Sequence, residues 1–232
     1  VRTSRHSILG ITEHLPATIL RVSMDGETAD IQYHNQWRVN SVYPRGIRYG
    51  VRIAILTSWA WGSVLYGRNR HHRYARMRRR YRNNYAYNDV NDFQRVVNEN
   101  PDLGTIVMEG ARYDYPTKEF LDEIQKTAQQ KGILIVLDEI TSGWRITDGG
   151  VYKTNGLKPD IVVYGKGIGN GYAISAILGK KEVMDIAQDT FISSTFWTEK
   201  VGFVAALNTI DIIVREKVWE HLEYIGNCIG SG

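Results

Sequence analysis

The stretch Ile133-Leu-Ile-Val-Leu-Asp-Glu-Ile-Thr-Ser-Gly-Trp-Arg145 decides the expected fold. It opens with five consecutive apolar residues, a pattern typical of a strand buried on both faces of a parallel sheet. A second apolar run, Ile161–Tyr164, leads into Gly165-Lys166. Asp138 and Lys166 therefore both follow predicted strands, at the sheet edge where open α/β folds bind their ligands.

The sequence on both sides of this stretch alternates between helical and strand patterns. Side chains that can cap helices stand before segments with helical spacing of apolar residues, and Gly132 is placed to end the second helix. This alternation predicts an open α/β sheet flanked by helices. Helices are expected to begin after Asn88 or Asp89, after Thr117 and near Glu199, and strands to span 104–108, 133–137, 161–164 and 174–178.

Length and composition fit a soluble protein with one large domain. The 232 residues are 43% hydrophobic, and no run of 18 apolar residues predicts a membrane span. The first residues do not resemble a signal peptide. Cys228 is the only cysteine, so neither an internal disulfide nor a cysteine-based zinc site is expected, and we expect a cytoplasmic protein without a metal centre.

The positive charge belongs to one segment. Residues 68–82 contain eight arginines and no acidic residue, and without them the net charge of +4 becomes −4. Arginines interleaved with tyrosines are compatible with binding of nucleic acid through phosphate contacts and base stacking. A solvated basic stretch is the simpler interpretation, and we favour it over the nucleic-acid hypothesis.

Lys166 and Asp138 are the residues best placed for chemistry. A lysine nucleophile must sit where a carbonyl cofactor can be held, and the glycines around Lys166 allow a ligand to approach the backbone closely. A carboxylate at the end of an apolar strand favours a cationic partner, such as a protonated pyridine nitrogen. Taken singly, Lys166 is explained equally well as a surface lysine in a turn. Asp138, taken singly, is explained better as an aspartate that caps a helix or lies in a loop.

Taken together, these motifs resemble the class III aminotransferases, specifically the branch of glutamate-1-semialdehyde 2,1-aminomutase. The spacing between Asp138 and Lys166 also fits that family. The resemblance covers roughly residues 85–232. The matching stretches are 106–110, 135–145, 158–171, 173–184 and 193–202.

The resemblance implies a pyridoxal 5'-phosphate (PLP) enzyme of transferase fold type I, whose large domain has a mainly parallel sheet flanked by helices. It implies that Lys166 is the Schiff-base lysine and proton shuttle, and that Asp138 keeps the pyridine nitrogen protonated. Ile140 would pack on a ring face, and Thr195 would bind the phosphate across a homodimer interface. Glu109 would help to shape the pocket. The implied substrates are an amine or amino acid and a keto or aldehyde compound.

Upstream, the resemblance weakens. The family's phosphate-binding turn corresponds best to residues 25–30, where Gly26 and Thr28 match and Glu27 does not. The family's cofactor-stacking aromatic ring falls near residue 58, and Trp59 is the candidate to replace it. A simple turn and a core tryptophan are the alternative interpretations.

We therefore divide the chain into three parts. Residues 1–84 are a divergent part of the large domain, residues 85–214 its PLP-binding core, and residues 215–232 the start of a C-terminal small domain that the chain does not complete. Residues 30–84 keep the family's length without its pattern, which suggests the hypothesis of a shifted reading frame. The expected function is an aminotransferase or aminomutase. A catalytically inactive relic of the same fold is the alternative.

Overall fold

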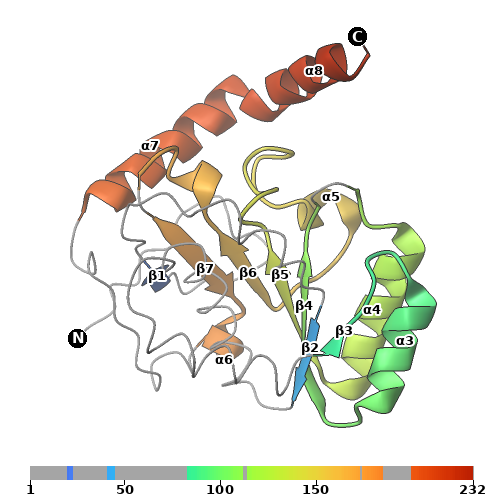
Figure 1. The fold of residues 1–232 in the computed structure, drawn as a ribbon. Helices are drawn as coiled ribbons and strands as arrows, with labels where there is room; N and C mark the ends of the chain where they lie inside the picture. The colour runs from blue at the N-terminus through green and yellow to red at the C-terminus, as the bar shows by residue number, and fades with distance from the viewer. Residues whose placement is uncertain are drawn as a thin grey trace, which may run out of the picture.

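The structure, a computed structural model, describes residues 20–22, 41–44, 83–111, 114–172, 174–184 and 200–231, which form a sheet with helices beside it (Figure 1). The strands are β1 (Leu20–Val22), β2 (Ser41–Pro44), β3 (Asn83–Asn84), β4 (Leu103–Glu109), β5 (Leu134–Asp138), β6 (Ile161–Tyr164) and β7 (Ser175–Gly179). The helices are α3 (Val90–Glu99), α4 (Lys118–Lys131), α5 (Tyr152–Asn155), α6 (Lys181–Met184), α7 (Val201–Glu216) and α8 (Val218–Gly230), with a 3-10 turn η2 (Lys166–Ile168).

Within the described residues the sheet has the strand order β1-β7-β6-β5-β4-β2-β3. Its centre is parallel, because β5 pairs in parallel with both β4 and β6. The outer pairings are antiparallel, so the sheet is mixed, and the expectation of a mainly parallel sheet holds only for the centre. The α/β class is confirmed. Residues 165–174 join β6 to β7, and they are too few for the crossover of a dozen or more residues that a parallel pairing requires.

Strand β5 lies in the middle of the sheet and is buried on both faces. Ile135, Val136 and Leu137 have no exposed surface, and all four residues of β6 are buried as well. This agrees with the expectation from the apolar runs, since a strand covered on both faces has no polar position. The two strand ends that carry the predicted chemistry are therefore anchored by buried strands.

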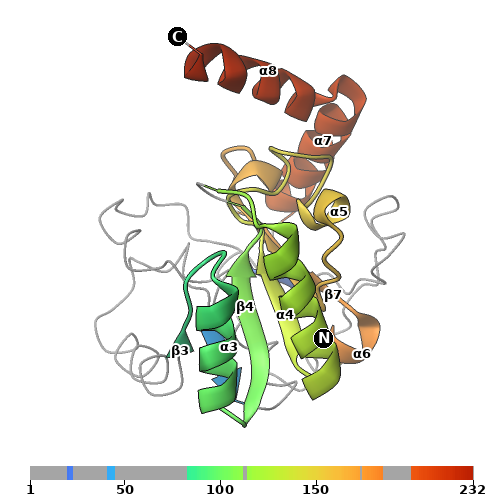
Figure 2. The same cartoon turned by 90° about the vertical axis from the view of Figure 1, so that its right-hand side faces the viewer.

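Helices α3 and α4 lie side by side against one face of the sheet (Figure 2). Their aromatic residues meet there, with the Phe93 and Phe120 ring centroids 6.4 Å apart in an edge-on arrangement. Both rings are completely buried, and such contacts add to the stabilisation from apolar burial. The buried residues of the two helices are Phe93, Val96, Val97, Phe120, Leu121, Ile124, Thr127 and Ala128.

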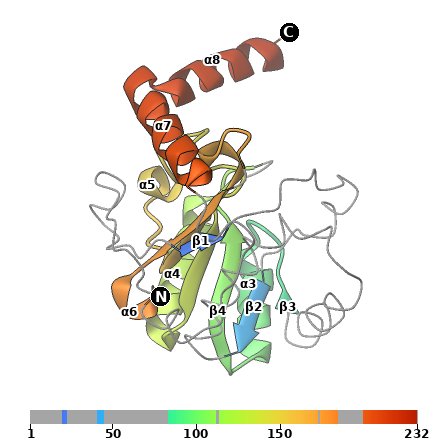
Figure 3. The same cartoon turned by 90° about the vertical axis from the view of Figure 1, so that its left-hand side faces the viewer.

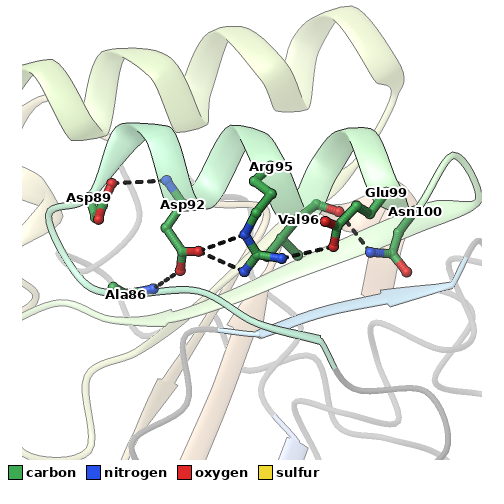
Figure 4. A network of polar contacts seen from close by, with 7 residues as sticks. All are labelled: Ala86, Asp89, Asp92, Arg95, Val96, Glu99 and Asn100. Atoms are coloured by element: carbon green, nitrogen blue, oxygen red, sulfur yellow. Dashed lines mark hydrogen bonds and ion pairs between the residues drawn. The ribbon is translucent and has the colours of Figure 1, made fainter.

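The start of α3 is stabilised by a side-chain cap. Asp89, rather than Asn88, is the capping residue, because its carboxylate accepts a hydrogen bond from the Asp92 backbone N–H at 2.9 Å (Figure 4). Asn88 instead takes a left-handed conformation with φ of 61° and accepts from the Thr117 backbone N–H. This bond ties the start of α3 to the start of α4.

Helices α7 and α8 extend beyond the sheet towards the C-terminus, and α8 projects away from it (Figures 1 and 3). On α7 the buried residues are Gly202, Ala206 and Ile213. The apolar residues Val204 and Leu207 of the same helix are 55% and 52% exposed. None of the helices in the described ranges is both long and apolar enough to cross a membrane.

Candidate active site

The predicted pair of reactive residues lies on two neighbouring strands. Asp138 is the last residue of β5, and Lys166 stands two residues beyond the end of β6. Because β5 and β6 are parallel, with Asp138 opposite Val163, their carboxyl ends meet at the same edge of the sheet. The structure therefore places both residues at the edge where ligands of open α/β sheets bind.

Lys166 is held by its backbone conformation and by a hydrogen bond from its side chain. Its φ of 43° lies in the left-handed region, which residues with a side chain seldom adopt, and it begins the 3-10 turn η2. Its Nζ donates a hydrogen bond to Thr141 Oγ1 at 3.0 Å. Strained backbone of this kind is concentrated at functional sites, where the surrounding structure enforces it. The contact joins the residues after β6 to the loop after β5.

Asp138 is half-buried and fixed by the turn that follows it. Its Oδ1 accepts a hydrogen bond from the Ile140 backbone N–H at 3.0 Å. Its carbonyl oxygen accepts from the Gly110 N–H at 3.1 Å, which continues the parallel pairing with β4. The carboxylate is thus held at the strand end in one orientation.

Ile140 packs beside the segment that carries the lysine. It is 1% exposed, and a Cβ added to Gly165 would lie 3.3 Å from its Cγ2. A side chain at position 165 would therefore press on Ile140. The glycine before Lys166 permits this close approach.

Thr141 and Glu139 are residues of this site that the sequence interpretation missed. Thr141 was only part of a matched motif, yet it is the hydroxyl that contacts the lysine. Glu139 is completely buried, and burial raises the pKa of its carboxyl to about 7, against hydrogen bonds from Ser142 and from the Val151 and Tyr152 backbones that lower it. A second acid next to Asp138, at the end of the apolar run 133–137, was the signal that could have identified Glu139.

Other predicted residues are not part of what the structure describes. Thr195, Gly26, Thr28 and Trp59 lie outside the described residues, as does the basic segment 68–82. Glu109 ends β4 opposite Asp138, which brings it to the same sheet edge. The structure thus brings together Lys166, Asp138 and Ile140, together with Thr141 and Glu139.

These residues fit the group expected from the sequence. An aldehyde needs a primary amine, which Lys166 supplies, and a pyridine nitrogen needs an acid that keeps it protonated, which Asp138 supplies. Both come from the ends of adjacent parallel strands, and the apolar Ile140 lies between them along the chain. The donor set is therefore suited to an aromatic carbonyl cofactor.

Comparison with known proteins agrees with this geometry. The family model described as "Aminotransferase class-III" matches residues 90–232, which is more than half of the chain. The chain belongs to the class III aminotransferase family. The matched range includes every residue of the site described above.

Two relatives show the range of activities within this aminotransferase family. A 3-aminobutyryl-CoA aminotransferase of Cloacimonas acidaminovorans is 35% identical over 155 residues, which are 63% of this chain and 37% of the relative. A glutamate-1-semialdehyde 2,1-aminomutase of Nitrosopumilus maritimus is 32% identical over 59% of this chain and 34% of the relative. The chain spans about a third of the length of these relatives.

Solved structures support the fold. The FumI protein of Sphingopyxis sp. MTA144, determined in its PLP internal aldimine form, is 29% identical, with a TM-score of 0.53 over 56% of this chain and 33% of its own. An S-selective transaminase from Arthrobacter sp. has the same TM-score at 22% identity, over 61% of this chain and 33% of its own. The fold is thus that of the PLP-dependent transaminases, as the sequence predicted.

Proposed function

We propose that the chain is the cofactor-binding part of a PLP-dependent enzyme that transfers an amino group between an amine or amino acid and a keto or aldehyde acceptor. The observation that carries this proposal is the placement of the Lys166 amine and the Asp138 carboxylate at the ends of adjacent parallel strands. Family membership and the PLP form of the FumI protein support it.

Lys166 has two tasks in this proposal. Its amine would hold the cofactor through the aldehyde group, and, once free, the same amine would act as the general base that removes a proton from the substrate carbon. The Thr141 hydroxyl, 3.0 Å from Nζ, keeps the amine at the sheet edge. From that position the lysine would carry the proton between the substrate carbon and the cofactor carbon.

Asp138 and Ile140 hold the ring. The Asp138 carboxylate would accept a hydrogen bond from the protonated pyridine nitrogen, and its orientation is fixed by the Ile140 N–H. When bound, PLP serves as the electron sink for the charge left on the substrate carbon. Ile140, which is buried beside Gly165, would pack on one ring face, as the family resemblance implies.

Intramolecular transfer is the finer form of the proposal. Several relatives are glutamate-1-semialdehyde 2,1-aminomutases, at identities of 28% to 34%. The 3-aminobutyryl-CoA aminotransferase shows that similar chains transfer the group between molecules. We propose transfer of an amino group as the chemistry shared by both kinds of relative. Transfer within one molecule, as in an aminomutase, is the specific activity to test next to transfer between molecules.

The remaining parts of the proposal concern residues outside the described ranges and the assembly. Thr195, Gly26 and Thr28 would bind the phosphate, Trp59 would stack on the ring, and two copies of the chain would complete the site. We propose residues 85–214 as the PLP-binding core and a cytoplasmic location. The rival hypotheses are nucleic-acid binding by residues 68–82 and an inactive relic of the fold.

Absorbance spectroscopy tests the proposal. PLP is added to the purified chain and to two variants, Lys166→Ala and the matched control Lys181→Ala, which removes an exposed lysine of α6. A new band between about 300 and 500 nm should form in the wild type and in Lys181→Ala but not in Lys166→Ala, and an amine donor should discharge it. The same spectrum from all three chains would contradict the proposal, and an inert wild type would favour the relic.

A further inference from the structure

Glu139 is a buried carboxyl that the proposed chemistry does not use. It has no exposed surface, although it directly follows Asp138 at the site. The Glu139 N–H donates to the Val163 carbonyl at 2.9 Å, so the strand pairing continues through it. Side chains alternate along such a segment, and Glu139 therefore points away from the side that Asp138 faces.

The Glu139 carboxyl joins both ends of the loop 140–150. At the start of the loop, Ser142 Oγ donates a hydrogen bond to Glu139 Oε2. At its end, the backbone N–H groups of Val151 and Tyr152 interact with the same carboxyl. The loop is also closed across its middle, where the Trp144 N–H donates to the Gly149 carbonyl at 2.7 Å.

Two glycines pack directly against Glu139, Gly110 against its carboxyl and Gly143 against its backbone carbonyl. A Cβ added to Gly110 would lie 2.6 Å from Glu139 Oε1, and one added to Gly143 would lie 2.6 Å from the Glu139 carbonyl oxygen. The Gly143 N–H also donates to that oxygen at 2.8 Å. The backbone therefore packs directly on this residue, and removal of its side chain would leave a gap beside Gly110 and release Ser142 from its hydrogen bond.

That loop carries the contacts of the lysine. It includes Ile140, which packs against Gly165, and Thr141, whose hydroxyl accepts from Lys166 Nζ. The Thr141 carbonyl is held separately by Arg145, whose guanidinium donates to it at 2.6 Å. Displacement of the loop would therefore move the groups that orient the reactive amine.

We propose that Glu139 is a positioning residue: its carboxyl holds loop 140–150 in the conformation in which Thr141 orients the Lys166 amine and Ile140 packs beside it. The inference rests on the proposed function, since it assigns a role relative to cofactor capture by Lys166. Asp138 is the neighbour whose negative charge opposes ionisation of Glu139, and the hydroxyl groups of Tyr87, Tyr152 and Tyr164, which stay protonated near neutral pH, also face it. Loss of its proton near neutral pH therefore adds a negative charge beside Asp138, and capture by Lys166 should depend on that proton.

The experiment measures covalent capture instead of turnover. Each chain is incubated with PLP and borohydride from about pH 5.5 to 8.5, a range around the pKa of Glu139, and the rate of adduct formation on the Lys166 peptide is followed by mass spectrometry. The variants are Glu139→Ala, Glu139→Gln and Ser142→Ala. Glu223→Gln, an exposed position on α8, is the matched control. Circular dichroism without PLP reports whether each chain folds.

We expect Glu139→Ala to capture PLP at least about tenfold more slowly than the control at every pH, because misplacement of a reacting group lowers rates steeply. Glu139→Gln should restore capture and lose the change that the wild type shows between about pH 6 and 8, since the amide imitates the protonated acid. Ser142→Ala should fall between them. A purely structural role would not produce this restoration or this pH profile.

The opposite results overturn the inference. If folded Glu139→Ala captures PLP at the control rate with an unchanged pH profile, Glu139 does not position the amine. If Glu139→Ala does not fold, the other two variants decide. The inference is then overturned if Glu139→Gln and Ser142→Ala both capture PLP at the rate of Glu223→Gln and with the same pH profile. Failure of the proposed function looks different, because then the wild type and Glu223→Gln also show no adduct at Lys166.

Discussion

The hydrogen bond between Lys166 and Thr141 is the smallest unit of the proposed cofactor site. The amine of a side chain with four rotatable bonds is fixed only if something holds its end, and the Thr141 hydroxyl does so at 3.0 Å. The left-handed backbone at Lys166, with φ of 43°, fixes the other end. Orientation of this kind reduces the loss of entropy that the reaction would otherwise require.

Replacing Thr141 by valine tests this contact. The substitution keeps the branched shape and removes the hydroxyl, so we expect borohydride-fixed capture of PLP by Lys166 to slow by roughly three- to tenfold while the fold is kept. Thr154→Val, which removes a hydroxyl bonded to the Val151 carbonyl on α5, is the control. Equal capture rates in the two variants would show that Thr141 does not orient the amine.

Glu139 makes stability depend on pH in a predictable direction. Burial raises the pKa of its carboxyl to about 7, above its ordinary value, so the folded state binds the proton more tightly than the unfolded state. The stabilisation is complete below the unfolded pKa and is lost as pH rises through about 7. From the size of the shift, this loss is on the order of 3 kcal/mol.

Glu139→Gln removes this dependence because the amide does not titrate. Relative to the wild type, the free energy of unfolding of the variant should increase by on the order of 2–3 kcal/mol between about pH 5 and 8. Urea titrations at several pH values measure it. Parallel pH profiles for the two chains would mean that Glu139 stays ionised in the folded protein.

Individual residues of the site were predictable from the sequence to different degrees. The placement of Asp138 and Lys166 at strand ends was predictable, because a strand end is visible as the end of an apolar run and because their motifs match a family. Thr141 and Glu139 were missed because their roles depend on the turns of loop 140–150. No periodicity in the sequence describes those turns, and only the folded backbone brings Ser142 and Tyr152 to the same carboxyl.

At the scale of elements, the predicted strand 133–137 begins one residue too early. The Ile133 N–H donates to the Ala128 carbonyl at 2.9 Å, and Gly132 adopts the left-handed conformation with φ of 64°. Ile133 thus completes the end of α4, and β5 begins at Leu134. An apolar residue can serve either purpose, so hydrophobicity alone did not locate the boundary.

The cap of α4 offers a test of an element by itself. Thr117 Oγ1 accepts a hydrogen bond from the Phe120 N–H at 3.3 Å, which satisfies one of the free donors at the start of the helix. Thr117→Ala should lower the free energy of unfolding by about 1 kcal/mol in urea denaturation. Lys131→Ala, an exposed change in the same helix, should have little effect. A loss no larger than that of Lys131→Ala would contradict the capping role.

At the scale of the whole molecule, the layered α/β fold and its transaminase type followed from the alternating pattern and the family motifs. The antiparallel direction of β7 was not predicted, although the sequence shows that the connection between β6 and β7 is short. The chain spans about a third of the length of its relatives. Among the described residues, most of the large exposed apolar side chains lie on helices α7 and α8. Exposed patches of this kind mark surfaces that pack against other protein.

The proposed homodimer predicts self-association through α7. Val204 and Leu207 are about half exposed, so we expect light scattering after size exclusion to show a dimer in the wild type and a monomer in the double variant Val204→Glu, Leu207→Glu. A variant with two added acids on α4, Gln129→Glu, Gln130→Glu, is the control. A wild-type chain that stays monomeric at all concentrations, or a double variant that stays dimeric, would contradict this assignment.

Identification of the lysine that binds the cofactor tests the central claim most directly. The purified chain is incubated with PLP, reduced with borohydride and digested, and mass spectrometry locates the added group. We expect modification of Lys166 at near-stoichiometric levels, and none above background at Lys153, Lys180 or Lys181. Modification spread over exposed lysines, with Lys166 no more reactive than the others, would show that this sheet edge is not a cofactor site.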